Sequence, residues 1–523
     1  MAVEKIRYQA FFAIINLMKK ITFVVVLFLI VFILGRNLNP FSSTMFTFHD
    51  STQPARIQQF VLELRQLHIP PRIAPDFNFK LGFPVFNFYA PFSYWLTGLI
   101  NLTGFDIVSS LKLSFLLALL VGFTGSYLFL KNFFDFYPSL LGGVLYITSL
   151  YFPLDIFVRG NLAELWFLAL MPLTFHLAYK NSLKNNRKIF FLTTIILSFT
   201  LTSHNIYSLI FIPLVLIFIL LLKNKKTNLP SLLFALFLSG YFWLPAIAEM
   251  SSTWAKEVAT LTSFQNHFLC LNQLWDSPWG YGGSTQDCIS DGLSFKIGKL
   301  QIIFFTLGLL MFLYKTLVKK NKINKILLFF TIYSLFFLFL TLYQSKLIWE
   351  LFSPIMSVVQ FPWRFIGPSL LGISFLASYF FQNLKIPIKS FIVFFLILAT
   401  IFINQKYFKG QTIKQTEFEK RYLTQSYIEK KAAYAIAEYL PKTIDYNYWR
   451  SLEKKKEVPL EFIAKSSIEP FDKDKQTLIE KVGNFISLST LIFLMFLNIK
   501  IINRFLKKNL FERPSNNVKQ NSR

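Results

Sequence analysis

The segment ITFVVVLFLIVFILG, residues 21–35, contains no charged side chain and is the first of many apolar runs in the chain. A helix that crosses a bilayer needs roughly 20 mostly apolar residues, and fewer where flanking groups reach the headgroups. No small-residue cleavage site follows this run, so we interpret it as a retained membrane helix and not as a signal peptide. About fifteen residues beyond it, His49 and Asp50 precede a short amphipathic segment.

The composition places the whole chain in the same class. Hydrophobic residues make up 54% of the 523 residues, with 64 Phe and a mean hydropathy of +0.47, which exceeds what a soluble core needs. We therefore expect an all-α polytopic membrane protein with about 12 transmembrane helices, in a range of roughly 11 to 13. The expected spans lie near residues 21–35, 109–130, 138–154, 162–179, 189–203, 206–222, 229–247, 300–318, 326–343, 365–382, 387–404 and 484–502.

Short loops that are rich in Lys and Arg alternate along the chain almost without a break. Loops rich in these residues stay on the cytoplasmic side of a membrane. With the N-terminus inside, the inside segments hold 26 basic residues against Glu4, Asp135 and Glu512, which is +23 of the formal net charge of +27. The charge therefore indicates topology in a plasma membrane, with both termini cytoplasmic and contact with anionic lipids, and gives no argument for nucleic acid.

This topology holds only if the apolar segment Phe88–Leu102 (FYAPFSYWLTGLINL) does not cross the membrane. Its Pro91, Tyr94 and Trp95 suit a helix at headgroup level. A segment before it places one apolar stripe on a helix, formed by Ile57, Phe60, Val61, Leu64 and Leu67. We expect two juxtamembrane helices in the first outer loop, residues 36–109; a thirteenth span with a locally broken charge rule is the alternative.

Three further long segments are expected on the outer side, at residues 250–299, 344–364 and 405–483. Both cysteines, Cys270 and Cys288, lie in the first of them, where an oxidising compartment permits pairing. We predict a disulfide between them, and two free thiols are the alternative. In the last segment, SYIEKKAAYAIAEYLP (residues 426–441) predicts a helix ended by Pro441, followed by solvated Lys and Glu clusters. The chain thus divides into a transmembrane module (1–404), an outer polar segment (405–483) and a last helix with a basic tail (484–523).

Polar side chains gather at the expected outer ends of the spans. Polar groups at membrane depth are costly, so they are functional candidates by default. The candidates are His49, Asp50, Asp76, Arg159, Asn161, Glu164, His204, Asn205, Glu249 and Arg364. Because they come from several outer helix ends, they can converge on one pocket.

Most of these candidates also have a structural interpretation. Asn161 followed by Glu164 has the spacing of a capping box at a helix start. His204 can bond a neighbouring helix, and Arg364 can anchor at the headgroups. Glu249 can simply mark a helix end.

Asp50 is harder to explain structurally. It precedes a Pro-started helix, for which Ser51 or Thr52 is the better N-cap. Asp76 is a second carboxylate in the same loop. One of these two acids can be a catalytic base. The other is then either a metal ligand or a loop staple, that is, a side chain that holds the loop together.

In their order along the chain, the motifs resemble those of a known family. They are FHD (48–50), PVFNFYAPFSYWL (84–96), RGNLAE (159–164), SHN (203–205), YFWLPAIAE (241–249), FPWR (361–364) and EYLP (438–441). The order and the shared outer side resemble a group of bacterial and archaeal polytopic membrane proteins described as related to 6-pyruvoyl-tetrahydropterin synthase. That group looks like a branch of the GT-C glycosyltransferase superfamily. The resemblance covers Met1 to about Pro441.

The two parts of this resemblance imply different chemistry. The soluble pterin enzyme is a zinc protein with several His ligands, whereas this chain has five scattered His without paired spacing, so we set pterin chemistry aside. GT-C enzymes use polyprenyl-phosphate-linked sugars and place a catalytic Asp or Glu in the first outer loop, which by resemblance is Asp50. The family pattern often carries two acids there. Here the partner is His49, which leaves open any need for a divalent cation such as Mg²⁺ or Mn²⁺.

A sugar transfer of this kind needs a base and a cation. A carboxylate takes the proton of an acceptor hydroxyl as that oxygen attacks the anomeric carbon. Arg159 and Arg364 are the candidates for binding the lipid phosphate that leaves, because Arg gives bidentate geometry. One base on one face would mean direct displacement with inversion. The acceptor is a glycan, a lipid or a protein, and an apolar groove between helices would hold the lipid tail.

Two other classes of function stay open. A lipid or glycan transporter or flippase predicts internal symmetry and broken helices with polar groups near the midplane. A catalytically inactive relative would act as a scaffold. Transfer that survives Asp50→Asn would exclude Asp50 as the base.

Overall fold

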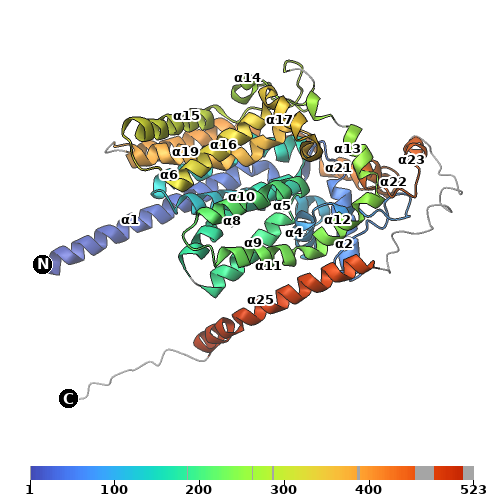
Figure 1. Ribbon diagram of the computed structural model, residues 1–523, viewed down its shortest axis with the longest axis horizontal. Helices are drawn as coiled ribbons and strands as arrows, with labels where there is room; N and C mark the ends of the chain where they lie inside the picture. The colour runs from blue at the N-terminus through green and yellow to red at the C-terminus, as the bar shows by residue number, and fades with distance from the viewer. Residues whose placement is uncertain are drawn as a thin grey trace.

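The computed structural model describes residues 2–184, 186–261, 263–285, 288–385, 389–453 and 476–510, and it is built almost entirely of helices (Figure 1). Within these ranges the strands are β1 (Thr44–Thr47) and β2 (Gln411–Lys414), which pair antiparallel with Thr44 opposite Lys414. The long helices run side by side across the view. The protein is therefore an all-α membrane protein with a small sheet at one end.

Each of the twelve expected spans coincides with helical structure. In chain order the helices are α1 (Ala2–Leu29), continued to Leu34, α5 (Ile107–Leu130), α6 (Phe136–Thr148), α7 (Tyr151–Leu154) with the π-helical turn η3 (Asp155–Arg159), α8 (Leu162–Leu183), α9 (Arg187–Leu201), α10 (Asn205–Leu221), α11 (Asn228–Leu238), α12 (Gly240–Glu249), α15 (Lys299–Leu313), α16 (Lys325–Thr341), α19 (Ile366–Asn383), α20 (Lys389–Asn404) and α25 (Leu478–Leu510).

Not all of these helices are long enough to cross a membrane by length and composition. Eight in the described ranges are, or up to nine if α11 and α12, which are bent by 61° at Ser239, form one span. Helices α9, α10 and α16 have 15, 17 and 17 residues. The membrane helices are thus present, and the total of twelve crossings stays a prediction.

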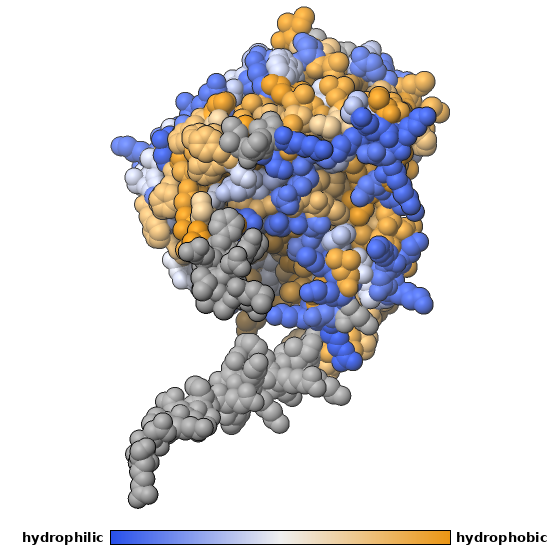
Figure 2. Space-filling view, turned by 90° about the vertical axis from the view of Figure 1, so that its left-hand side faces the viewer, coloured by the Kyte–Doolittle hydropathy of each residue, from blue (hydrophilic) through white to orange (hydrophobic). Residues whose placement is uncertain are grey.

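The helix ends sort into two groups. One cavity joins the ends of α8 and α10 to the start of α16, and a second joins the loop after α5 to the ends of α15 and α19. Five loops that the charge pattern assigns to the inside therefore share one end of the bundle. Figure 2 views the molecule from this end, where hydrophilic side chains spread over much of the surface.

The first outer loop begins and ends at the opposite end. Ser109, at the start of α5, donates a hydrogen bond to the backbone oxygen of Pro40, which follows the first helix. Within this loop α4 (Phe92–Leu102) has 11 residues, about 16 Å of helix, which is half of the hydrocarbon thickness. The chain between the first helix and α5 therefore returns to the end from which it started, without a crossing.

Helix α2 (Gln53–Arg65) packs its apolar stripe against α4. Gly98 permits the close approach, because a Cβ there would lie 3.3 Å from the Leu64 side chain. Four of the five expected stripe residues are buried, but Leu67 is 79% exposed. The helix ends at Arg65 and Leu67 has a φ of +62°, so the expected position of Leu67 on this face is wrong.

The outer polar segment folds over the first outer loop. It contains α21 (Gln415–Tyr422), α22 (Gln425–Lys430), the 3-10 segment η11 (Ala432–Tyr439) and α23 (Tyr446–Leu452). The expected single helix before Pro441 is wrong, because α22 ends at Lys430 and Ile436 has a non-helical φ of −132°. Trp449 donates to the Asn78 side chain at 2.8 Å, which ties α23 to the first loop. The expected Lys and Glu clusters lie largely outside the described residues.

Short helices complete the first outer loop and the other outer segments. They are α3 (Val85–Phe88), α13 (Ala255–Leu261), α14 (Leu271–Trp275), α17 (Lys346–Leu351) and α18 (Ser353–Met356). Cys270, directly before α14, is joined to Cys288 by a disulfide with a Cα–Cα distance of 5.8 Å. The structure therefore contains the pairing that the sequence suggested, and no free thiol occurs among the described residues.

Candidate functional site

Asp50 is held in place by the chain that follows α7. Its backbone N–H donates to the carbonyl oxygen of Arg159 at 2.9 Å. Gly160 comes next with a φ of +66°, and a Cβ there would overlap the ring of Phe48. The RGN turn and the FHD segment therefore fit together only with glycine at this position.

The carboxylate of Asp50 is clamped by side chains of α2. Arg56 Nη2 lies 2.7 Å from Asp50 Oδ1, Gln53 Nε2 donates to Oδ2 at 2.7 Å, and the Thr52 hydroxyl donates at 3.1 Å. The Arg56 side chain is 2% exposed and that of Asp50 is 25% exposed. A buried guanidinium needs a counter-charge, and Asp50 supplies it while keeping one side toward solvent. Thr52 thus bonds Asp50 and does not cap α2 with its side chain.

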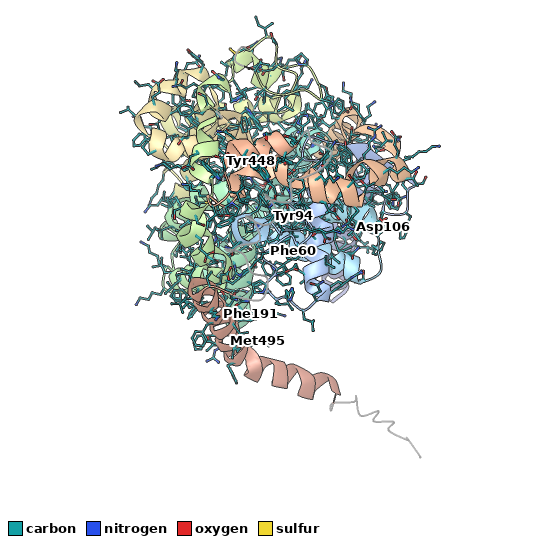
Figure 3. The ribbon with its side chains drawn as sticks, turned by 90° about the vertical axis from the view of Figure 1, so that its right-hand side faces the viewer. Phe60, Tyr94, Asp106, Phe191, Tyr448 and Met495 are labelled. Atoms are coloured by element: carbon teal, nitrogen blue, oxygen red, sulfur yellow. A yellow bond between two sulfur atoms is a disulfide. The ribbon has the colours of Figure 1, made fainter. Side chains whose placement is uncertain are left out.

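The aromatic wall beside this pair comes from α4 and the FYAP segment. Tyr94 accepts a hydrogen bond from Arg56 at 3.2 Å, and Arg56 lies over the Tyr89 ring at 5.2 Å. Burial raises the pKa of Tyr94 to about 12, so it stays protonated at neutral pH. Figure 3 views this end, where Phe60 and Tyr94 lie close together with ring centroids 6.0 Å apart.

Glu438 of the EYLP motif lies near the same charges. Burial raises its pKa; the charges of Arg56 and Arg364 act against this rise, and Asp50 adds to it. Glu438 is half-buried and has no ion-pair partner in the part of the chain that the structure describes. A carboxyl group with a raised pKa beside a clamped carboxylate is a candidate proton acceptor.

Behind Asp50 lies a buried ion cluster built by η3 and α8. Arg159 pairs with Asp155 and, at 2.7 Å, with Glu164. The hydroxyls of Tyr151 and Tyr207 also donate to Glu164. The donors of Arg159 are thus directed at internal acids, so its geometry favours a structural ion pair over the expected binding of a lipid phosphate.

Arg364 differs from Arg159. Its Nη1 donates to the carbonyl of Val359 at 2.8 Å and to the Gln360 side chain at 3.3 Å, and its Nε is buried without a partner. No carboxylate pairs with it in the described ranges. The neighbouring Trp363 is 4% exposed, and its ring centre lies 4.7 Å from the Arg159 guanidinium. Arg364 is the cation best placed to bind an added anion.

The capping interpretation of Asn161 describes a real contact, and His204, expected to bond a neighbouring helix, caps the start of its own helix. Asn161 Oδ1 accepts from the backbone N–H of Glu164 at 3.1 Å at the start of α8. His204 Nδ1 accepts from the backbone N–H of Tyr207 at 3.3 Å at the start of α10. Burial lowers the pKa of His204 to about 3, and Arg364 adds to the effect. His204 is therefore neutral at pH 7.

Two candidates in the first outer loop, His49 and Asp76, form hydrogen bonds outside the cluster. The His49 ring is exposed and bonds the backbone oxygen of Tyr281 at 2.8 Å, away from the Asp50 carboxylate. Asp76 accepts from Gln59 at 3.0 Å and its N–H donates back to the same side chain at 2.7 Å. Asp76 is therefore a loop staple, which was one of its two interpretations.

Glu249 and Asn205 also serve as connectors. Glu249 accepts from Asn87 at 2.7 Å and from Thr477 at 2.6 Å, which ties α12 to α3 and to the start of α25. Asn205 bonds the backbone of Phe88 and Ala90. The structure thus brings together Asp50, Arg159, Glu164, His204 and Arg364, and leaves Glu249 outside.

Sequence reasoning missed several members of this cluster. They are Arg56, Tyr89, Tyr94, Tyr151, Asp155, Tyr207 and Glu438. Asp155 follows an apolar run without a motif of its own, and Arg56 reads as an ordinary polar position on an amphipathic helix. Glu438 carried a signal, because EYLP is one of the motifs that resemble the family.

The side chains present do not build a metal site. In the described ranges, no three or more His, Cys, Asp or Glu side chains come together in a way that could hold a metal ion. The oxygens of Asp50 are taken by Arg56, Gln53 and Thr52, and His49 is turned away.

Comparison with known proteins places the chain in a family. Residues 86–407 match the model of the 6-pyruvoyl-tetrahydropterin synthase related domain, which is described as a membrane protein. The matched region includes Arg159, Glu164, His204 and Arg364, whereas Asp50 and Glu438 lie outside it. No curated protein matches the chain. Since the match covers more than half of its residues, this chain belongs to the 6-pyruvoyl-tetrahydropterin synthase related family of membrane proteins.

Proposed function

We propose that the protein is an inverting glycosyltransferase of the GT-C type, which transfers a sugar from a polyprenyl-phosphate donor to an acceptor hydroxyl at the outer face of the membrane. The observation that carries the proposal is a carboxylate and a cation at the same end of the helix bundle. Asp50 presents a partly exposed carboxylate, and Arg364 presents a cation that pairs with no acid among the residues that the structure describes. The charges of Asp50 and Arg364 both interact with Tyr89 and with Glu438.

Arg364 fits the leaving phosphate. The negative charge on the leaving group grows as the sugar–phosphate bond breaks, and a guanidinium stabilises it with two parallel hydrogen bonds. Nη2 of Arg364 is neither buried nor hydrogen-bonded within the described residues, so it is one such donor. Arg159 supports the site by pairing with Asp155 and Glu164, which reduces the repulsion between these two buried acids and the donor phosphate.

A groove beside the site suits the lipid tail. A cavity of about 310 Å³ lies at the bend between α11 and α12. Its lining is apolar, formed by Leu209, Ile212, Leu236, Phe237, Gly240, Trp243, Leu244, Ile247 and Ile486. Trp243 donates to the backbone oxygen of Leu201 at 3.0 Å, three residues before His204, so the groove wall reaches toward the polar cluster.

Asp50 is the proposed base. The acceptor oxygen gives its proton to the carboxylate and bonds to the anomeric carbon, while the carbon–oxygen bond to the phosphate breaks and its electron pair leaves with the phosphate. Arg56, Gln53 and Thr52 already donate hydrogen bonds to the Asp50 carboxylate, so the acceptor hydroxyl must share its oxygens with them. Glu438, whose pKa is raised, is the second candidate for the same step.

Transfer from labelled polyprenyl-phosphate sugars in membranes containing the protein tests the proposal. We expect product with wild type and with Glu417→Gln, which removes an exposed acid paired with Arg421. Asp50→Asn should abolish transfer, and the product should have the inverted anomer. If Glu438→Gln abolishes transfer while Asp50→Asn retains it, the base is Glu438. Transfer by both variants at the wild-type rate would contradict the proposed site.

One observation favours a transporter as the second candidate, namely the 61° break between α11 and α12. Broken helices in transporters place polar groups at the break, where they meet the substrate. Here the break lines an apolar groove. Movement of a fluorescent polyprenyl lipid between leaflets of proteoliposomes, unchanged by Asp50→Asn and without transfer, would support the transporter.

A further inference from the structure

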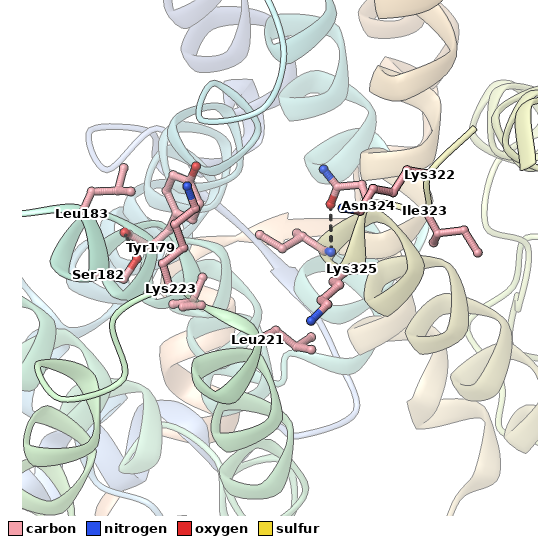
Figure 4. A pocket seen from close by; sticks show the side chains of 11 residues that line it. Tyr179, Ser182, Leu183, Leu221, Lys223, Lys322, Ile323, Asn324 and Lys325 are labelled. Atoms are coloured by element: carbon pink, nitrogen blue, oxygen red, sulfur yellow. Dashed lines mark hydrogen bonds between the residues drawn. The ribbon is translucent and has the colours of Figure 1, made fainter. Parts of the chain in front are cut away.

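A second cavity lies at the other end of the bundle, far from Asp50. It has a volume of about 470 Å³ and opens between the ends of α8 and α10 and the start of α16 (Figure 4). Its lining consists of Tyr179, Ser182, Leu183, Leu221, Leu222, Lys223, Lys322, Ile323, Asn324, Lys325 and Ile326. None of these residues is acidic.

The cavity is strongly positive. Lys223 comes from the end of α10, whereas Lys322 and Lys325 come from the loop and first turn of α16. None of the three pairs with a carboxylate among the residues that the structure describes. The start of α16 adds the positive end of a helix dipole, where Asn324 Oδ1 accepts from the Ile326 N–H at 2.9 Å. Three like charges around one hollow favour an anion between them.

The rest of the lining favours a particular kind of anion. Leucine and isoleucine side chains make up five of the eleven lining residues, and the hydroxyl groups of Tyr179 and Ser182 stand beside them. A free phosphate gains nothing from apolar walls, whereas a phosphate esterified to a diacylglycerol buries its glycerol and first methylenes there. Basic pockets between membrane helices are a known form of site for anionic lipid headgroups.

The position of the cavity along α8 agrees with the depth of lipid headgroups in a membrane. Glu164 and Ser182 lie on the same helix, α8, eighteen residues apart. At 1.5 Å per residue they are separated by about 27 Å, close to the thickness of the hydrocarbon core. A cavity at Ser182 therefore stands at the headgroups of one leaflet when Glu164 stands near those of the other.

We propose that this cavity binds the phosphodiester headgroup of an anionic phospholipid from the leaflet on the basic side, which the charge pattern predicts to be cytoplasmic. A neighbouring cavity of about 290 Å³ shares Lys322 and Asn324 and extends the surface that the lipid contacts. The site joins α8, α10 and α16, so the bound lipid braces three helices that also hold the polar cluster at the other end. This proposal does not depend on the transferase activity.

The test uses the full-length protein purified in a mild detergent, with binding of phosphatidylglycerol measured by native mass spectrometry and by the midpoint of thermal unfolding. The variant Lys223→Gln/Lys322→Gln/Lys325→Gln should bind phosphatidylglycerol about 100-fold more weakly, from the usual contribution of each lysine near an anionic surface. The control Lys188→Gln/Lys225→Gln/Lys226→Gln loses the same charge from the same end without touching the cavity and should bind like wild type.

Three results would overturn the proposal. Phosphatidylcholine that raises the midpoint as much as phosphatidylglycerol would remove the role of charge. Inorganic phosphate with the same effect would remove the role of the lipid. An equal loss of binding in the control would show diffuse attraction to the basic surface. Lys322→Gln alone, in an exposed loop, keeps the test valid if the triple variant fails to fold.

Discussion

The Asp50–Arg56 pair gives the sharpest prediction about stability. Asp50→Asn leaves the Arg56 guanidinium, 2% exposed, without its counter-charge. Removing one partner of a buried pair costs roughly 3 to 5 kcal/mol, and the lower end applies because Asp50 is 25% exposed. We therefore expect a loss of about 3 kcal/mol, which lowers the midpoint of thermal unfolding by about 6 °C.

The double variant Asp50→Asn/Arg56→Gln should recover most of this loss. It leaves no isolated charge, so its stability should lie within about 1 kcal/mol of wild type. The coupling energy between the two positions, which also includes the cost of Arg56→Gln alone, should then be at least about 2 kcal/mol. The measurement is the unfolding midpoint in detergent, followed by tryptophan fluorescence or by the folded fraction after heating. Glu417→Gln is the control, because the Glu417–Arg421 pair is about half exposed and worth about 1 kcal/mol at most. A double variant no more stable than Asp50→Asn would refute the reasoning.

Three further predictions follow from the cluster behind Asp50. Arg159→Gln should destabilise the protein by at least about 3 kcal/mol because it leaves Asp155 and Glu164 without their cation. Arg364→Gln should keep the wild-type midpoint and lower the kcat of transfer, because the charge that Arg364 stabilises grows in the transition state. Equal midpoints for the two variants would contradict this distinction. The pKa of His204 is lowered to about 3, so between pH 6.5 and 3 the unfolded chain binds one more proton than the folded chain, and stability falls by about 1.4 kcal/mol for each unit by which pH falls. His204→Asn keeps a helix cap and should flatten the dependence of the unfolding midpoint on pH. An unchanged slope would exclude His204 as its source. Gly160→Ala should lower the free energy of unfolding by about 1 to 3 kcal/mol, because Gly160 has a φ of +66° and a Cβ would meet Phe48. The control Gly104→Ala, at a φ of +109° with open space around it, should lose only the free energy of its backbone strain. Equal unfolding midpoints for the two variants would exclude the Phe48 contact.

The sequence predicted the helices well because apolar runs and charged loops are local signals. Each of the twelve runs is helical, and the loops that follow α5, α8, α10, α15 and α19 meet at one end, as the positions of Lys and Arg required. The end of α2 was placed too late because Leu67 continues the apolar period, while its φ of +62° shows that the chain has already turned.

The site was predicted less completely because its contacts join distant parts of the chain. The strands β1 and β2 pair although more than 360 residues separate them, and this pairing brings the EYLP segment over the first outer loop. No local sequence pattern predicts this contact. Acids at outer helix ends look alike in sequence, yet Glu164 meets Arg159 and Glu249 meets Asn87. Whether an acid belongs to the cluster depends on the side chain that it contacts, and these contacts cannot be predicted from the sequence.

The transfer rate of the Asp50→Asn/Arg56→Gln double variant tests the central claim most directly. This variant should stay folded, so a loss of activity cannot come from a stranded Arg56 charge. With labelled polyprenyl-phosphate sugar as donor in proteoliposomes, the account predicts transfer by wild type and by Glu417→Gln, and at least about a hundredfold slower transfer by the folded double variant, the usual loss without a general base. Transfer by the folded double variant within a factor of about two of wild type would contradict it.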